Sequence, residues 1–281
     1  MNLRNLLRKS LLIISVLGIT SCSDDDSSPT VAHLIKTPNV SGYSKLTGVT
    51  RAGVFENKCA WDFNYKVENL SSAVSTLQHS SNIETEGKKT NYSFSYGEDY
   101  VGIKTDGSQI SLILNESALA YKAMSGNTTY NYSYTGGYLT SWNVIYKNDG
   151  FAGSSTKGAM AEIERSVTGN ITSVKYTPSA DASDDYYTYA LEYEETENNN
   201  GLLPECLSKE LGCDGFECLY YAGLFGNGTK NLVKSIVVTH SKNLDYNVVY
   251  NFNYVIDAYG NIINCSYGTI ENPIVVTYKY N

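Results

Sequence analysis

Aromatic and polar residues alternate along much of this chain, and this period-two pattern constrains the fold more than any other feature. In one run, Tyr92, Phe94 and Tyr96 alternate with serines. Further runs of the same kind are Tyr130 to Tyr134, Tyr187 to Tyr193 and Tyr246 to Tyr254. Because successive side chains of a strand point to opposite faces of its sheet, each run predicts a strand with one aromatic face.

Residues that favour tight turns separate these runs at intervals of about ten residues. They are Asp106-Gly107, Gly136-Gly137, Asn148-Asp149-Gly150, Gly169-Asn170 and Tyr259-Gly260-Asn261. Glycine and asparagine accept the positive φ that tight hairpins require. The spacing predicts antiparallel hairpins rather than alternating strands and helices. We therefore expect an all-β fold: a large antiparallel meander sheet that is curved or closed.

One segment, 201–232, lacks the alternation and predicts a short helical insertion that contains cysteine. Pro204 to Leu211 is typical of a helix with proline near its start, and a glycine follows it. We expect a second helix from Gly215 to Phe225, capped by Asp214, with its apolar side against the sheet.

The first 21 residues have the features of a signal peptide. Basic residues precede the apolar run Leu11 to Ile19, which is too short for a bilayer that requires about twenty residues. The stretch Ile19-Thr20-Ser21-Cys22 resembles a bacterial lipobox, in which cleavage occurs before a cysteine whose thiol is acylated. We predict lipidation at Cys22 and attachment to the membrane through this lipid. The alternative is an ordinary secreted protein that is cut nearby.

Residues 22–45 are expected to form a flexible acidic tether ahead of a single β domain, 46–281. The stretch Ser23 to Pro29 contains three aspartates and no residue that would join a core. A lipidated cysteine followed by acidic residues looks like the export signal of surface lipoproteins in the Bacteroidota. It implies an outer membrane lipoprotein exposed at the cell surface. The alternative is a solvated spacer with no sorting role.

Two stretches near the C-terminus carry a resemblance to a known family. They run from Tyr220-Tyr221-Ala222-Gly223-Leu224-Phe225-Gly226 through Lys230 to Ile236, and from Tyr250 to Cys265. Together they resemble the DUF4595 family of Bacteroidota lipoproteins. The resemblance implies a porin-like fold and supplies neither an activity nor a catalytic residue. An N-terminal lipid and the many Asn, Ser and Thr residues do not fit a true membrane pore.

Cysteine use leaves several arrangements open. Besides Cys22 the chain contains Cys59, Cys206, Cys213, Cys218 and Cys265. An odd number leaves at least one thiol unpaired in a monomer. Three of the five, Cys206, Cys213 and Cys218, cluster in the insertion, where a disulfide would staple a segment with little core of its own. Zinc would require closer pairs and a nearby histidine, so we predict no metal.

No catalytic motif is present, and no cofactor is predicted. The chain lacks G-x-S-x-G, H-E-x-x-H and a phosphate-cradling loop. Acidic pairs that share a strand face more often decorate its solvent side than form a glycosidase site. The scattered candidates are His33, His79 and His240, the pairs Glu162/Glu164 and Glu192/Glu194, and the acidic turn Asp181, Asp184 and Asp185.

Charge excludes one class of partner. Removal of the signal peptide leaves 18 basic and 29 acidic residues, a net charge near −11. Because phosphate neutralisation requires a clustered basic face, nucleic acid is a poor partner for such a chain.

The aromatic excess, with 25 tyrosines, suggests ligand binding or core formation. Tyrosine and tryptophan rings stack on sugars, and Trp61, Trp142 and Tyr138 are the candidate contacts; alternatively, the rings form cross-strand ladders in the core. We predict a lipid-anchored binding or scaffold module for a glycan or surface protein, rather than an enzyme. One alternative is a hydrolase, which requires a cleft with two converging carboxylates and a raised pKa. The other is a carrier, whose curved sheet requires an apolar concavity.

Overall fold

The computed structural model describes residues 45–53, 58–66, 69–78, 87–147, 155–269 and 271–281. The predicted signal peptide and the tether up to residue 44, with Cys22, lie outside these ranges. His33, His79 and the turn Asn148-Asp149-Gly150 do so as well.

The described chain is almost entirely β-structure. The strands are β1 (Leu46–Gly53), β2 (Lys58–Lys66), β3 (Asn69–Gln78), β4 (Lys88–Tyr96), β5 (Tyr100–Thr105), β6 (Gln109–Leu114), β7 (Ala120–Ser125), β8 (Thr128–Thr135), β9 (Tyr138–Lys147), β10 (Ser155–Arg165), β11 (Ile171–Thr177), β12 (Tyr187–Glu197), β13 (Asn231–His240), β14 (Asn247–Asn251), β15 (Asn253–Ile256), β16 (Ile262–Gly268) and β17 (Pro273–Tyr280). The helices are η2 (Ala180–Ala182), η3 (Glu205–Leu207) and α1 (Glu217–Tyr221). None of the described helices has the length and apolar character needed to cross a membrane.

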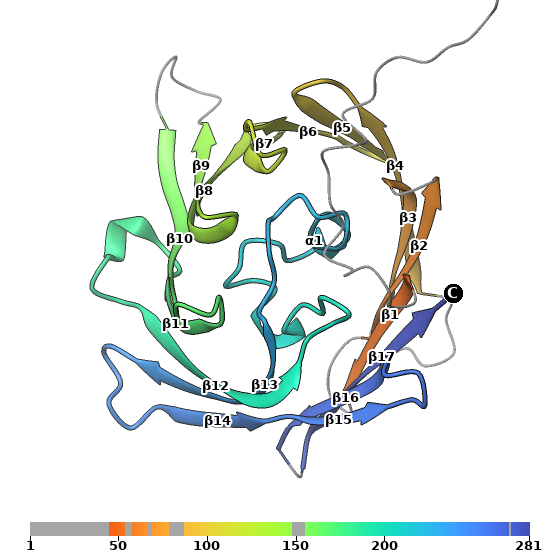
Figure 1. The fold of residues 1–281 in the computed structure, drawn as a ribbon. Coiled ribbons are helices and arrows are strands. Elements are labelled where there is room, and N and C mark those ends of the chain that lie inside the picture. The colour runs from red at the N-terminus through yellow and green to blue at the C-terminus, as the bar shows by residue number, and fades with distance from the viewer. Residues whose placement is uncertain (1–44, 54–57, 67–68, 79–86, 148–154, 270) are drawn as a thin grey trace, which may run out of the picture.

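The 17 strands form one antiparallel sheet that curves into a nearly closed barrel (Figure 1). Almost every strand pairs with its neighbours in the sequence, and β1 pairs with both β2 and β17, which joins the two ends of the sheet. Among the described strands, the exception is at Phe252, between β14 and β15. There β14 pairs with β13, and β15 pairs with β16. The Phe252 amide donates to the Lys234 carbonyl at 3.0 Å there. The predicted all-β meander is confirmed.

The aromatic runs lie in strands, as the alternation predicts. Tyr92 to Tyr96 belong to β4, Tyr130 to Tyr134 to β8, and Tyr187 to Tyr193 to β12. In β4, Tyr92 is buried and Phe94 and Tyr96 are half-buried, whereas the serines between them are exposed. The aromatic face therefore points into the barrel, and the small polar residues face outward. Only the last run is interrupted, at Phe252 between β14 and β15.

The interior of the barrel is filled by the chain itself. A ring of about eight strands is filled by its own side chains, whereas one of sixteen or more encloses a channel. Here residues 198–230, which connect β12 to β13, lie inside the ring (Figure 1). We call this segment the plug. Its position explains why the segment without alternation is also rich in buried leucine and tyrosine.

The plug contains less helix than the sequence predicts. The helix expected over Pro204 to Leu211 is the single 3-10 turn η3, and the helix expected from Gly215 to Phe225 is the five-residue α1. Phe216, not Asp214, precedes α1, and it makes no side-chain cap. We expected α1 to contact the sheet with one apolar side. Instead, all five of its residues are buried, so the helix is packed on every side.

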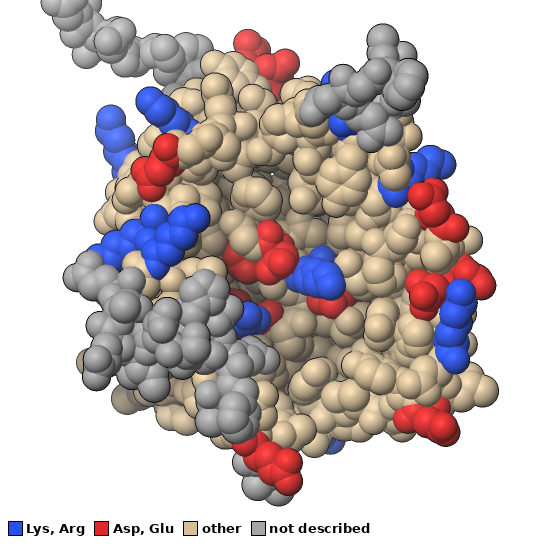
Figure 2. All heavy atoms as spheres, turned by 180° about the vertical axis from the view of Figure 1, so that it is seen from behind, with Lys and Arg blue, Asp and Glu red and all other residues tan. Residues whose placement is uncertain are grey.

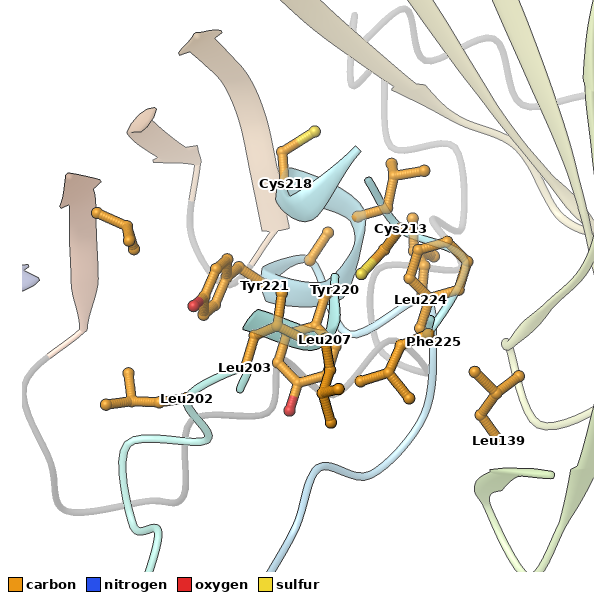
Figure 3. Close-up of a cluster of buried hydrophobic side chains, with 14 of the residues drawn as sticks. Leu139, Leu202, Leu203, Leu207, Cys213, Cys218, Tyr220, Tyr221, Leu224 and Phe225 are labelled. Carbon is orange, nitrogen blue, oxygen red and sulfur yellow. The ribbon is translucent and has the colours of Figure 1, made fainter. Parts of the chain in front are cut away.

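Leucine and aromatic side chains of the plug form a core with the wall of the barrel. Figure 3 shows Leu203, Leu207 and Tyr220 grouped together, with Leu139 of β9 set apart on the other side of Phe225. Full burial of each such side chain contributes about 1.5–3 kcal/mol relative to its exposure. The other plug residues labelled there are Leu202, Cys213, Cys218, Tyr221, Leu224 and Phe225, all buried.

Hydrogen bonds from inward-facing aromatic residues fix the plug to the wall. The Trp142 Nε1–H donates to the Glu210 carbonyl at 2.7 Å, and the Tyr132 hydroxyl donates to the Gly212 carbonyl at 3.1 Å. On the neighbouring strand β7, the Ala120 amide donates to the Leu224 carbonyl at 2.9 Å. These bonds satisfy carbonyls of an irregular segment that would otherwise be buried without partners.

Candidate functional site

A cavity of about 350 Å³ lies between the plug and the strands β1 to β4. The wall supplies aromatic rings and two cations, and the plug supplies three acids. The lining residues of this cavity, which we call the acidic cleft, are Val49, Arg51, Cys59, Trp61, Ser75, Leu77, Lys88, Thr90, Tyr92, Glu205, Asp214, Gly215 and Glu217. One end of the barrel is hollowed near its centre, and acidic and basic side chains gather there (Figure 2).

The wall of the cleft is built on inward-facing positions of β2 and β4. Alternation places Trp61 and Phe63 on the inner face of β2, with Asp62 exposed between them. The ring of Trp61 lies 5.1 Å from that of Tyr92 and is tilted by 48° to it, and it stacks on Phe63 at 6.3 Å. Such offset contacts hold the indole in one orientation.

Two residues that line the cleft each contain a buried polar atom without a hydrogen-bond partner among the described residues. One is Trp61 Nε1, in a side chain that is 4% exposed, and the other is Glu217 Oε2, in a residue that is 8% exposed. Burial of a polar group without a partner costs about 1–3 kcal/mol, so native proteins rarely leave one in this state. Because both atoms are themselves inaccessible to solvent, they lie behind the surface of the cleft and not on it.

Burial makes Glu205 and Glu217 weaker acids than an exposed glutamate. The pKa of Glu205 is raised to about 7, chiefly by desolvation and then by the neighbouring charge of Glu217, whereas the Tyr221 hydroxyl and Arg51 oppose the shift. Desolvation likewise raises the pKa of Glu217, and Arg51 lowers it. The Tyr221 hydroxyl donates to Glu205 Oε1 at 2.8 Å. The cleft therefore holds two carboxyl groups whose charge depends on nearby cations.

A second cavity, of about 300 Å³, shares Arg51 with the acidic cleft. It lies between the plug and the C-terminal strands, and its plug side carries Cys206 and Glu210. The Tyr189 hydroxyl donates to Glu210 Oε1 at 2.7 Å, and desolvation raises the pKa of Glu210. Because one Glu210 oxygen is already paired with a wall tyrosine, this carboxyl group chiefly binds the plug to β12.

The cysteines of the described chain are separate thiols. The structure therefore does not pair Cys206, Cys213 and Cys218, although all three lie in the plug as expected. Burial raises the pKa of Cys59 to about 11 and that of Cys265 to about 12. Both groups are thus protonated and poorly nucleophilic near neutral pH.

The structure separates the three aromatic residues that the sequence suggests for sugar binding. Trp142 is 4% exposed and bonded to the plug, so its ring belongs to the core. Tyr138 is half-buried and lies under the Arg165 guanidinium, 4.9 Å from the ring centroid. Only Trp61 lines the acidic cleft.

The acids and histidine singled out from the sequence lie elsewhere. Glu162 and Glu164 are exposed on β10, and Glu192 accepts a hydrogen bond from Ser235 at 3.2 Å. In the acidic turn, Asp185 pairs with His240 at 2.7 Å, and Asp184 pairs with Lys242 at 3.1 Å. Within the described ranges, no group of three or more acidic, cysteine or histidine residues is placed to hold a metal.

Sequence reasoning identified Trp61 but missed the buried acids of the cleft. Glu205 and Glu217 lie in a segment otherwise rich in leucine, tyrosine and cysteine. Carboxylates in so apolar a segment are a usable signal, because acids are rarely buried without a reason. Arg51 is one of two arginines beyond the predicted signal peptide, and it faces them from β1.

Comparisons with known proteins concern the fold. No family profile matches the chain, and no curated protein matches it, so membership of DUF4595 stays a prediction. A porin-like protein from Bacteroides uniformis aligns with 85% of this chain and 99% of its own, at 13% identity and a TM-score of 0.67. A porin-like protein from Bacteroides vulgatus aligns over the same shares, at 13% identity and a TM-score of 0.55. The chain therefore has the fold of these porin-like proteins.

Proposed function

We propose that this protein is an envelope lipoprotein that binds a small polar ligand in the acidic cleft. The observation that carries the proposal is a cavity of about 350 Å³ with aromatic rings on its wall side and the acids Glu205, Asp214 and Glu217 on its plug side. A cavity of this size is in the range that small molecules occupy. Aromatic walls with a small number of placed polar groups are typical of such sites.

The envelope location rests on the N-terminal sequence. Lipidation of Cys22 would anchor the barrel, and the acidic tether would direct it to the cell surface. Radiolabelled palmitate should be incorporated into the wild-type protein and not into Cys22→Ala, and protease added to intact cells should degrade the wild type. Soluble secretion of both forms without label would refute the anchor, and full protection from protease would refute the surface location.

Binding is tested with purified protein that lacks residues 1–21, by thermal shift and intrinsic tryptophan fluorescence. The probes are a panel of monosaccharides, amino sugars and small amines. We expect at least one probe to raise the melting temperature and to change the emission of Trp61. The change should be lost in Trp61→Phe and retained in Glu164→Gln, whose side chain is exposed on β10. A silent panel would argue against small-ligand binding.

A hydrolase is the second candidate function. Glu205 and Glu217 line the same cleft, and burial raises the pKa of each, which suits the general acid of a catalytic carboxylate pair. Chromogenic aryl glycosides provide the test. Release of the aryl group should fall strongly in Glu205→Gln and Glu217→Gln. Equal release by both variants, or none by the wild type, would reject the hydrolase.

The two other ideas receive less support. An apolar carrier requires an open apolar concavity, yet the plug fills the barrel with its own leucine and tyrosine side chains. A sugar cannot stack on Trp142, because this ring is buried beneath the plug. A partner protein at the surface remains open as a scaffold function.

A further inference from the structure

We propose that the acidic cleft and the second cavity together bind one elongated, neutral oligosaccharide of two or three units. This inference rests on the proposed binding function and names the ligand class of that site. It follows from the position of the plug within the ring, from the residue that the two cavities share and from the groups that line them.

The plug is held by its backbone to one arc of the ring. Its carbonyls accept hydrogen bonds from Ala120, Tyr132 and Trp142, which belong to β7, β8 and β9. The two cavities lie along a different arc. The acidic cleft follows β1 to β4, and the second cavity follows β12, β13, β14, β16 and β17. Both are therefore parts of the space that remains between the plug and this arc of the wall.

The two cavities meet at β1. Arg51 lines both of them, and β1 pairs with β2 of the acidic cleft on one side and with β17 of the second cavity on the other. The plug is continuous across the same boundary, because Glu205 lines the cleft and the next residue, Cys206, lines the second cavity. An elongated ligand that passes Arg51 can thus occupy both cavities at once.

The cavities lie toward the end of the barrel that is remote from the predicted tether. β1 begins at Leu46, where the chain enters from that tether, and Arg51 lies five residues farther along the strand. Arg51 pairs with Cys59, Cys59 with Leu77 and Leu77 with Lys88, so these four residues form one row across β1 to β4. All four line the acidic cleft. An anchored barrel would therefore present this row away from the membrane, where a long solute can reach it.

The volumes favour a ligand longer than one sugar ring. The cavities measure about 350 Å³ and about 300 Å³. Small-molecule sites occupy about 300–1,000 Å³, so each cavity alone is near the lower limit, whereas the two together lie well inside the range. A monosaccharide would fill one cavity and leave the other to water.

The lining favours neutral rings that carry hydroxyl groups. The cations Arg51 and Lys88 line the cleft beside its acids, so the site does not select for a net charge on the ligand. Sugar hydroxyls both donate and accept hydrogen bonds, which suits a lining of carboxyl groups and cations. In the second cavity, aromatic rings with a polar edge suit the C–H faces of a pyranose. These rings are Tyr189, Tyr246, Tyr250 and Tyr267.

Calorimetry with sugars of increasing length tests the proposal. The probes are glucose, the α-linked maltose and maltotriose, and the β-linked cellobiose and cellotriose. We expect the affinity to rise about tenfold or more from glucose to the trimer in at least one series, because the added rings occupy the second cavity. Equal affinity at every length, or binding confined to single sugars and amines, would overturn the elongated ligand and leave the small-ligand site standing. Failure of every probe in the wider panel would instead reject the proposed function.

A pair of tyrosine variants tests the role of the second cavity. Tyr246 lines this cavity and is 36% exposed, whereas Tyr146 on β9 is 44% exposed and lines neither cavity. In Tyr246→Ala the ratio of trimer affinity to glucose affinity should fall toward one, and in Tyr146→Ala it should keep the wild-type value. Thr269→Ala, at an exposed position of the same cavity, should lower the ratio in the same direction. A wild-type ratio in both Tyr246→Ala and Thr269→Ala would contradict the proposal.

Discussion

The Tyr221 hydroxyl donates a 2.8 Å hydrogen bond to Glu205 Oε1 inside the barrel, and both residues belong to the plug. Tyr221 also contacts the wall, because its ring lies 5.3 Å from that of Phe63 on β2. A carboxyl group that tends to stay protonated thus lies at the contact between the plug and the sheet. The protonation of Glu205 should therefore affect how well the barrel holds its plug.

The first prediction is that the protein is more stable at pH 5 than at pH 8. Burial raises the pKa of Glu205 from 4.5 to about 7, so the folded protein binds this proton more tightly than the unfolded chain. The contribution is fully present below pH 4.5 and is lost as the pH rises through about 7. The free energy of unfolding should fall by up to about 3 kcal/mol across this window, as urea denaturation at each pH would measure.

Glu205→Gln supplies the control for this prediction. Glutamine is neutral at every pH and keeps an oxygen that can accept the bond from Tyr221. The variant should flatten the pH dependence, although the raised pKa values of Glu210 and Glu217 leave part of it. Glu164→Gln, on the outside of β10, should keep the wild-type slope. An unchanged slope in Glu205→Gln would contradict this account.

The second prediction compares two glycines of the plug. Gly212 and Gly215 both have positive φ, +71° and +74°. A Cβ at Gly212 would lie 2.8 Å from Cδ2 of the Trp142 ring, whereas one at Gly215 would meet nothing within 4 Å. Both alanine variants lose about 1–2 kcal/mol from the left-handed backbone. Gly212→Ala should lose about 1–3 kcal/mol more, because the buried ring must move.

Chemical denaturation of the two variants measures the difference directly. The shared backbone cost cancels in the comparison, so what remains is the contact between plug and wall at Trp142. Equal losses of stability would mean that the Trp142 ring moves without a loss of free energy of unfolding. The plug would then be less tightly packed against β9 than the structure indicates.

The strands could be predicted from the sequence because their signal is local. Tyr92, Phe94 and Tyr96 alternate with serines. Each aromatic residue and its neighbouring serine point to opposite faces of the sheet, which determines that the aromatic face points inward. The turn at Gly136-Gly137 likewise needs only positive φ at both residues, and both have it. Such features depend on a few adjacent residues, which is why the hairpins and the all-β class were predicted correctly.

The plug and its cleft depend on closure of the whole ring. The width of the interior is set by the number of strands that join before β1 meets β17, and no local pattern encodes this number. Glu217 and Trp61 line one cavity only because the segment after β12 turns back into the barrel. Helix signals such as Pro204 and Asp214 were overridden by packing inside the ring, where burial on all sides outweighs local propensity.

The third prediction concerns the thiols. Burial raises the pKa of Cys59 to about 11, and Cys213 and Cys218 are buried in the plug. Iodoacetamide at pH 7.5 should therefore label the native protein slowly, and Cys59 should react before the other two, because it lines the acidic cleft. Peptide mass spectrometry would locate the label. After unfolding without a reductant, all five described cysteines should react, whereas a pair that stays unlabelled would reveal the disulfide that the sequence allows.

The fourth prediction separates a structural from a ligand-binding role of Trp142. Its Nε1–H donates to the Glu210 carbonyl at 2.7 Å, and its ring is 4% exposed. Trp142→Phe removes the donor and part of the ring, so it leaves a buried carbonyl unpaired and should cost about 1–3 kcal/mol. The melting temperature should fall by about 2–4 °C for each kcal/mol lost. Tyr146→Phe on the same strand, at a ring that is 44% exposed, should change little. Loss of sugar binding in Trp142→Phe at an unchanged melting temperature would instead identify the indole as a ligand contact.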